Sequence, residues 1–356
     1  MKEVDYIIVG LGIAGLTFCE ELEKNNKKYV VFDAGQTTST LVSAGVINPV
    51  VLKRFTPVWN AHPHIKDAIQ FYKSLSDKLG VSLFEKMSML RIFKSIEEQN
   101  NWVVASDKNE LSDFLDPKII KNKNTNINAP FGFGKVNHTG KINPIQLLKE
   151  YKAYLEKGNK IRNESFQYEL LQEKNNQIYY QDIISKKIVF SEGASAKSNP
   201  FFPKITTIRK EPLIIPNKGE YIIIKAPELS LNSMLKTSLF IIPLGNHLYK
   251  VGATYDREDS STEITKNAKT ELVTKLTKII NCPFEVVGQV AGIRPTTRDR
   301  RPFLGTLNTS DNLVFFNGLG TRGITAAPTL AKQLYSHIEH QEQLPKEITI
   351  KRYYKW

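Results

Sequence analysis

A glycine-rich motif near the start of the chain has the residue types and spacing of a phosphate-binding turn. Residues 10–15 read GLGIAG, directly after the apolar run YIIV at residues 6–9 and before a segment whose apolar residues have helical spacing. In such a turn the first glycine permits a tight bend, the second lets the backbone approach a pyrophosphate, and the third lets helix and strand pack closely. The N–H groups at the helix start then face the phosphates. The motif predicts a dinucleotide site.

An acidic residue stands where a dinucleotide site needs one. Asp33 follows a second apolar run, YVVF at residues 29–32, and lies 18 positions after Gly15. A carboxylate at the end of this strand accepts hydrogen bonds from the hydroxyls of an adenosine ribose. It also repels a 2′-phosphate, which argues against NADP. FAD and NAD share this fingerprint, so these residues alone leave both open.

Two further segments favour FAD. Residues 40–49 (TLVSAGVINP) contain small side chains, which let backbone press against a large flat cofactor. Residues 317–328 (NGLGTRGITAAP) form a second strand, glycine turn and helix start. The partial positive charge of a helix N-terminus stabilises the anionic edge of a reduced flavin. Two such helix starts at opposite ends of one chain fit a long cofactor lying between them.

The elements that must position these residues predict an α/β fold. The first 32 residues read as a βαβ unit with a right-handed crossover. Helices are expected at residues 64–79, from 143, at 264–280 and at 323–340, and a last strand at 312–317. Between them, residues 178–190, 220–226 and 239–255 read as antiparallel strands with turns at 185–186 and 245–246. We therefore expect a Rossmann-like FAD-binding domain (residues 1–84, 139–205 and 289–356) interleaved with a mainly antiparallel β substrate domain (85–138 and 206–288).

Composition narrows the classes of partner. The formal charge of +13 attracts polyanions. The lysines are scattered, however, so solvated lysines and nucleic-acid binding both remain open explanations. The sequence has no apolar run of about 18 residues and no signal-peptide pattern, which predicts a cytoplasmic protein without a membrane partner. Its two cysteines, Cys19 and Cys282, lie far apart, and no metal site is expected.

The motifs together resemble the D-amino-acid-oxidase superfamily of FAD oxidoreductases, which includes glycine oxidase and sarcosine oxidase. Besides both glycine motifs, residues 191–195 (SEGAS), 218–220 (KGE), 252–254 (GAT) and 291–295 (AGIRP) are similar to that superfamily's conserved segments. Glu192 replaces a small residue usual in the first of these. Within the superfamily, residues 318–323 (GLGTRG) and 297–299 (TRD) resemble the FAD oxidase domain of the bifunctional tRNA (methylaminomethyl)thiouridine-biosynthesis protein. Residues 45–49 (GVINP) are a looser counterpart of its GALYP segment.

The resemblance implies an enzyme that transfers a hydride from the carbon next to an amine to FAD. It assigns Arg294 to the substrate carboxylate, and a planar two-pronged guanidinium suits that role. The substrate is then a small amine, such as glycine, sarcosine or a D-amino acid, or the carboxymethylaminomethyl group of a tRNA wobble uridine. FAD is expected to be non-covalent, because sarcosine-oxidase relatives attach it through a cysteine near the C-terminal motif, and this chain has none after Cys282. An NAD-linked dehydrogenase and a non-catalytic flavin-containing protein are the alternatives, and no oligomeric state is predicted.

The expected cofactor-binding residues are Gly10, Gly12, Ile13, Ala14, Gly15, Asp33, Ala34, Ser43, Ala44, Gly45, Val46, Gly193, Ala194, Gly318, Leu319, Gly320, Thr321, Arg322, Gly323 and Ile324.

Overall fold

The computed structural model of the chain describes residues 1–202 and 210–354. The chain divides into two compact units, each built from separate stretches. Unit 1 comprises Met1–Val42, Pro144–Asn217 and Ile293–Trp356, and unit 2 comprises Ser43–Asn143 and Lys218–Gly292. Residues 43–84, expected with the FAD-binding domain, lie in unit 2, where β3 (Val46–Ile47) pairs with β9 (Gly140–Ile142). The expected boundary at 205–206 falls outside the described residues.

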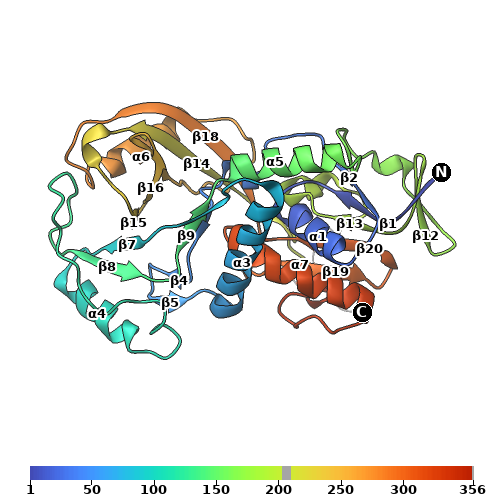
Figure 1. Cartoon of the computed structure of the whole chain (residues 1–356), viewed down its shortest axis with the longest axis horizontal. Coiled ribbons are helices and arrows are strands. Elements are labelled where there is room, and N and C mark those ends of the chain that lie inside the picture. The colour runs from blue at the N-terminus through green and yellow to red at the C-terminus, as the bar shows by residue number, and fades with distance from the viewer. Residues whose placement is uncertain (203–209, 355–356) are drawn as a thin grey trace. The chain divides into compact units, whose positions relative to one another are not determined.

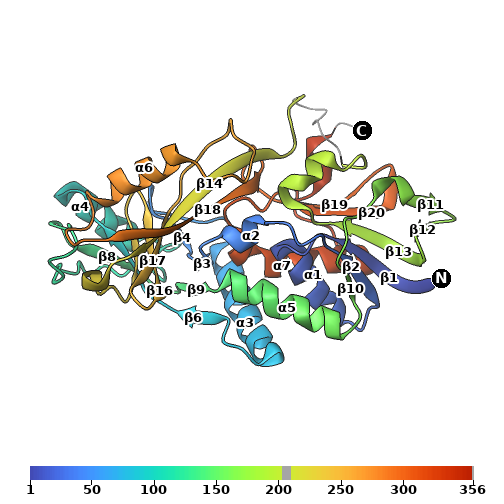
Figure 2. The ribbon, with the colours of Figure 1, turned by 90° about the horizontal axis from the view of Figure 1, so that it is seen from above.

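Unit 1 is organised around a mixed sheet whose centre is parallel, as Figures 1 and 2 show. Strand β1 (Lys2–Val9) lies between β2 (Tyr29–Phe32) and β13 (Ile183–Phe190), and both pair with it in parallel. Strand β20 (Ser310–Asn317) extends the sheet in parallel beyond β13. The remaining strands of this sheet are β10 (Ile161–Arg162), β11 (Gln172–Lys174), β12 (Gln177–Tyr180) and β19 (Phe303–Leu307).

Register fixes where the four parallel strands β1, β2, β13 and β20 end. Val9 lies opposite Phe32 on one side and opposite Phe190 on the other, and Phe190 lies opposite Phe315. The carboxyl ends of these strands therefore meet at one edge of the sheet. In open α/β sheets this edge is where ligands bind.

Two of the helices of unit 1 begin at that edge. The helices of this unit are α1 (Ile13–Lys24), α2 (Ser39–Val42), α5 (Pro144–Lys157) and α7 (Gly323–His340), with 3₁₀ turns η1 (Tyr168–Leu170), η2 (Gly193–Ser198) and η4 (Ile350–Tyr353). Helices α1 and α7 pack so closely that a Cβ on Gly323 would lie 3.0 Å from Ile13 Cγ2. Because α1 follows β1 and α7 follows β20, both start at the carboxyl edge of the sheet. The sequence predicted both helices.

Unit 2 is mainly antiparallel. Its largest sheet has the order β18-β14-β17-β16-β15-β7-β8, and β15 and β7 pair in parallel. These strands are β7 (Met89–Ile92), β8 (Phe133–Val136), β14 (Ile215–Lys225), β15 (Met234–Lys236), β16 (Phe240–Gly245), β17 (Leu248–Gly252) and β18 (Glu285–Thr296). The other elements are α3 (Ala61–Leu79), α4 (Ile96–Ser106), α6 (Lys266–Leu276), η3 (Pro227–Leu229), β4 (Val50–Val51), β5 (Thr56–Pro57) and β6 (Phe84–Lys86).

The α/β fold with an interleaved, mainly antiparallel part is confirmed, but some local predictions were wrong. The turn expected at residues 185–186 lies inside β13, where Ser185 is buried and its hydroxyl donates to Asp5 O. The chain turns earlier, at Gln181, whose φ is +50°. The helix expected over 264–280 begins only at Lys266, because the Thr265 side chain caps it by accepting from Ala268 N.

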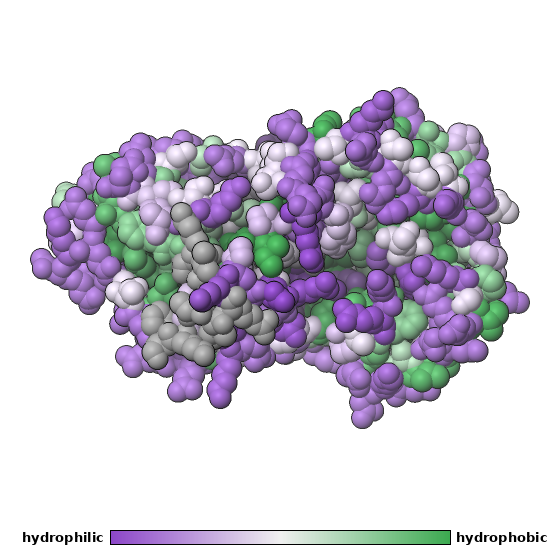
Figure 3. Space-filling model, turned by 180° about the vertical axis from the view of Figure 1, so that it is seen from behind, coloured by the Kyte–Doolittle hydropathy of each residue, from purple (hydrophilic) through white to green (hydrophobic). Residues whose placement is uncertain are grey.

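On the face drawn in Figure 3, hydrophilic side chains spread over the surface with smaller apolar areas between them. Among residues 1–202 and 210–354, no helix is long and apolar enough to cross a lipid bilayer.

Candidate functional site

The first glycine turn follows β1 at the carboxyl edge, and its three glycines have different roles. Gly10 has φ +94°, and a Cβ on Gly15 would lie 2.1 Å from Gly10 O, so the fold itself requires both glycines. Gly12 differs: a Cβ there would meet only Thr40 Oγ1, at 3.6 Å, among the described atoms within 4 Å. The packing of the protein therefore leaves room beside Gly12 for a group from outside the chain.

The start of α1 presents backbone donors beside this space. Gly12 is the N-cap and supplies no side-chain acceptor, and Ala14 lies in the first turn. Ile13 N donates to Thr40 Oγ1 over 3.0 Å. Thr40 lies on α2 and was not predicted as a site residue, since nothing in the sequence indicates that its hydroxyl reaches α1. Its oxygen marks where an anion could accept a hydrogen bond from this helix start.

Asp33 directly follows β2, and its carboxylate accepts hydrogen bonds from the first glycine turn and from the backbone after β2. Its Oδ1 accepts from Leu11 N at 2.9 Å and its Oδ2 from Gly35 N at 3.0 Å, with Ala34 between. A carboxylate has about four acceptor positions, so each oxygen retains capacity for a ribose hydroxyl. The structure thus brings Asp33 to the glycine turn, as predicted from the spacing.

Asn317 connects the turn that follows β13 to the turn that follows β20 at this edge. Its Nδ2 donates to Gly193 O at 2.9 Å, and its Oδ1 accepts from Gly318 N at 2.8 Å. Ala194 follows in η2. This side chain was missed because its bridging role depends on β13 and β20 being neighbours, which the sequence does not reveal.

The C-terminal turn lies beside the end of β18. Gly320, with φ +55°, donates its N–H to Pro295 O at 3.0 Å. Arg294 directly precedes Pro295, and its Nη1 donates to Asn217 Oδ1 at 2.9 Å. Unit 1 therefore holds the predicted substrate arginine next to the predicted cofactor turn. The other residues predicted here are Leu319 and Thr321, then Arg322 as N-cap, Gly323 and Ile324 at the start of α7.

The predicted segment 43–46 lies in unit 2. A Cβ on Gly45 would meet Ile142 O at 2.1 Å, so Gly45 is fixed by β9, and Val46 begins β3, with Ala44 preceding both. Lys250 on β17 donates from Nζ to Ser43 O at 2.9 Å and lies over the Tyr221 ring, 4.9 Å from its centroid. Burial lowers the pKa of Lys250 to about 8. Lys250 is a further candidate site residue. It was not predicted, because a single lysine in a strand carries no signal in the sequence.

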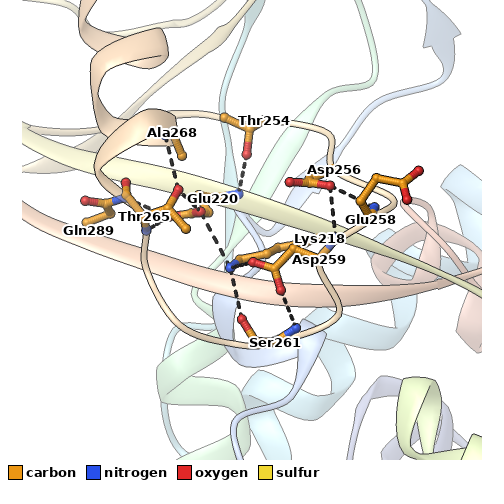
Figure 4. Close-up of polar contacts among 10 residues, drawn as sticks. All are labelled: Lys218, Glu220, Thr254, Asp256, Glu258, Asp259, Ser261, Thr265, Ala268 and Gln289. Carbon is orange, nitrogen blue, oxygen red and sulfur yellow. Dashed lines mark hydrogen bonds and ion pairs between the residues drawn. The ribbon is translucent and has the colours of Figure 1, made fainter.

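The KGE segment at residues 218–220 forms a buried polar network within unit 2, drawn in Figure 4. Lys218 pairs with Asp259, and its Nζ lies 3.8 Å from Glu220 Oε1. Glu220 accepts from Thr265 N and Thr265 Oγ1 at 2.9 and 2.8 Å. These contacts hold the middle and the C-terminal end of the loop between β17 and α6. We therefore read this segment as structural support rather than as a contact with cofactor.

Comparison with known proteins identifies the family of the chain and a relative of part of it. The model of the family described as DAO, FAD dependent oxidoreductase, matches residues 5–336. The tRNA 5-methylaminomethyl-2-thiouridine biosynthesis bifunctional protein MnmC of Idiomarina loihiensis is 27% identical over 125 residues, covering 33% of this chain and 20% of MnmC. The match thus spans about a fifth of that relative's length.

Solved structures share the fold. Glycine oxidase from Geobacillus kaustophilus superposes with a TM-score of 0.80 at 16% identity, covering 97% of this chain and 96% of that one. Iminodiacetate oxidase from Chelativorans sp. BNC1 gives 0.78 at 17% identity, with 98% of each chain covered. L-alpha-glycerophosphate oxidase from Mycoplasma pneumoniae, solved with FAD bound, gives 0.70 at 20% identity over 95% of each chain.

Proposed function

Because this chain belongs to the DAO family of FAD-dependent oxidoreductases, we propose that it oxidises the C–N bond of a glycine-type amine. The observation that carries the proposal is the placement of Arg294. The residue after it, Pro295, accepts from the N–H of Gly320, so the arginine lies beside the C-terminal glycine turn. An amine that also bears a carboxylate would be bound there by its anionic end.

The residues at the carboxyl edge of unit 1 fit FAD. Gly12 leaves space that a Cβ would occupy, and the α1 N-terminus directs backbone donors toward it. Asp33 stands at the end of the neighbouring strand with acceptor capacity for a ribose. We propose the predicted residues of the turns that follow β1, β2, β13 and β20 as the FAD contacts within unit 1. Residues 43–46 stay a prediction from the sequence.

The protein's own side chains then bind the substrate and orient it. Arg294 holds the substrate carboxylate with its planar, two-pronged guanidinium. A substrate fixed at that end presents its neighbouring C–H in one direction, which lowers the entropic barrier to transfer. When bound, FAD supplies the chemistry by accepting the hydride. The amine nitrogen loses a proton to solvent, and water hydrolyses the resulting imine to an amine and an aldehyde.

We propose modified tRNA as the substrate slightly ahead of a free amino acid. The match to MnmC and the charge of +13 support tRNA, in which a carboxymethylaminomethyl uridine would lose glyoxylate and keep an aminomethyl group. Glycine and sarcosine are the second candidate, supported by the fold shared with glycine oxidase over nearly the whole chain.

Anaerobic bleaching of the bound flavin tests the proposal. Purified holoenzyme is mixed with glycine, sarcosine, D-amino acids or tRNA carrying the modification, and the loss of flavin absorbance is followed. We expect one of these classes of substrate to reduce the flavin of the wild-type enzyme. Arg294→Lys should keep the flavin spectrum but lose most of that reduction, because lysine lacks the two-pronged guanidinium. FAD that no amine reduces would instead indicate a non-catalytic flavoprotein, and a colourless protein would indicate an NAD-linked enzyme.

A further inference from the structure

We propose that Asp299 is a positioning residue for the glycine turn that follows β20. Residues 350–353 hold its carboxylate, and the carboxylate in turn fixes Thr297, whose methyl group lies against that turn. All of these residues belong to unit 1. The inference rests on the proposed function only in assigning this turn to FAD, and it does not depend on which amine the enzyme oxidises.

The carboxylate of Asp299 is held by the turn η4, which comes much later in the chain. Arg352 Nε donates to Asp299 Oδ2 at 3.0 Å, and Arg352 Nη2 donates to Oδ1 at 3.4 Å. The Tyr353 hydroxyl donates to the same Oδ1 at 2.9 Å. A two-pronged pair of arginine and carboxylate fixes the orientation of both groups. The segment before η4 is itself tied to β19, because Leu304 N donates to Ile348 O at 2.8 Å.

Asp299 fixes the hydroxyl of Thr297, a buried residue two positions earlier. Thr297 Oγ1 lies 3.0 Å from Asp299 Oδ1 and 2.7 Å from Arg301 O, and these two acceptors share its one proton. Asp299 Oδ1 also accepts from Arg301 N at 3.0 Å, which closes the loop 297–301 on itself. Burial alone would raise the pKa of Asp299, but the hydrogen bonds from Arg352 and Arg301 N outweigh it and lower that pKa. The acceptor is therefore an ionised carboxylate at neutral pH.

A fixed hydroxyl also fixes the methyl group of Thr297, because both groups are bonded to the same Cβ. A Cβ on Gly318 would lie 2.9 Å from Thr297 Cγ2, so this methyl lies directly against the first residue of the glycine turn. Two residues later, Gly320 N donates to Pro295 O at 3.0 Å. The backbone of the turn is thus supported both by the end of β18 and by the loop 297–301.

The position of this turn matters for FAD because α7 begins directly after it, at Gly323. A helix N-terminus carries a partial positive charge, which stabilises anionic groups and falls off within the first turn. A displaced turn moves the first N–H groups of α7 with it. Reduced FAD, the more anionic form, then loses more stabilisation than oxidised FAD. The midpoint potential of bound FAD reports that difference, because it depends on the ratio of the two Kd values.

Four variants separate positioning from general stability. Asp299→Ala removes the acceptor, Asp299→Asn restores an oxygen that accepts from Thr297, and Thr297→Ser removes only the methyl group. Arg298→Met is the matched control, because it removes the ion pair with Glu211 from the same loop without touching Asp299. The Kd of oxidised FAD is measured by flavin fluorescence, the midpoint potential on the holoenzyme, and the free energy of unfolding of the apoprotein in urea.

We expect Asp299→Ala to bind oxidised FAD more weakly and reduced FAD more weakly still, by roughly a further fivefold, which makes the midpoint potential more negative. Thr297→Ser should shift both quantities in the same direction. The double variant should add little to Asp299→Ala, because the carboxylate acts through Thr297. Asp299→Asn should recover most of the affinity. Arg298→Met should change each Kd by less than about twofold, as for an exposed ion pair.

Two results would overturn the inference. An unchanged midpoint potential in Asp299→Ala, with only the free energy of unfolding lowered, would leave Asp299 a purely structural role. Fully additive shifts in the double variant would show that Asp299 does not act through Thr297.

Gly320→Val distinguishes failure of the inference from failure of the assignment on which it rests. Valine does not readily adopt the φ of +55° that Gly320 has, so this variant displaces the turn directly. If Gly320→Val weakens FAD binding and Asp299→Ala does not, the turn contacts FAD but Asp299 does not position it. If neither variant changes the Kd or the midpoint potential, the assignment of this turn to FAD fails as well.

Discussion

The ammonium of Lys218 and the carboxylate of Asp259 form an ion pair in which the lysine side chain is 1% exposed and the aspartate 33% exposed. Lys218 is the buried partner, and its removal leaves the buried Glu220 carboxylate, 3.8 Å from Nζ, without that cation. We expect Lys218→Met to lower the free energy of unfolding, measured by urea denaturation, by more than the loss of an exposed pair does. Lys275→Met removes an exposed pair with Glu271 and should cost less than about 1 kcal/mol. Equal effects of the two variants would contradict a structural role for Lys218.

The glycines of the first turn give a prediction that separates folding from cofactor binding. A Cβ on Gly12 meets only Thr40 Oγ1, whereas a Cβ on Gly15 runs into Gly10 O. We expect Gly12→Val to keep the secondary structure but to bind much less FAD, because its side chain occupies the pyrophosphate space. Gly15→Ala should impair folding itself. Flavin absorbance per protein and circular dichroism of each purified variant make the distinction, and full flavin occupancy in Gly12→Val would refute the assignment.

The same turn shows how far sequence reasoning reaches. The spacing from Gly10 to Asp33 predicted the βαβ unit, because a local motif dictates a local fold. The hydrogen bonds of Asn217 and Asn317 were not predicted, because they depend on strands that are distant in sequence but neighbours in the sheet. For the strand that carries Arg294, the sequence likewise indicated only the motif at residues 291–295 and predicted no strand. Its length, Glu285–Thr296, follows from pairing with β14 rather than from its own alternation.

Lys250 predicts a pH dependence of stability. Burial lowers its pKa from 10.5 to about 8, so below pH 8 the folded protein carries a buried charge at a cost of about 3 kcal/mol. Between pH 8 and 10.5 the unfolded chain binds the proton more tightly than the folded one, and the Lys250 contribution to stability therefore rises with pH. We expect Lys250→Met to be stabilised relative to wild type at pH 7, by less than that cost because the bond to Ser43 O is lost. The advantage should shrink by pH 9.5. Denaturant unfolding at both values tests this, and an unchanged difference would exclude the charge as its cause.

We predict that FAD is held without a covalent bond. The chain has two cysteines, and both are buried, Cys19 on α1 and Cys282 in unit 2. Burial raises the pKa of the Cys282 thiol, which keeps it in its unreactive protonated form. Acid precipitation should leave the yellow colour in the supernatant. Colour that stays with the pellet, and disappears from it in Cys19→Ser or Cys282→Ser, would show a thioether link instead.

The last prediction concerns tRNA. A protein that binds tRNA through phosphates releases counterions, so its affinity falls steeply with salt. If six or more phosphates are contacted, affinity should fall by a factor of about 10³ between 50 and 200 mM salt.

The charge of +13 provides the cations for such contacts, although some are engaged internally, such as Arg298 with Glu211 and Arg352 with Asp299. Flavin reduction by tRNA carrying the carboxymethylaminomethyl group, repeated at rising salt, measures the slope directly. Arg294→Lys serves as the control, because it should lose reduction yet retain tRNA, whose phosphates do not depend on the clamp. Rapid turnover of free glycine or sarcosine with little salt dependence, and no retention of tRNA at low salt, would decide for a small-molecule oxidase.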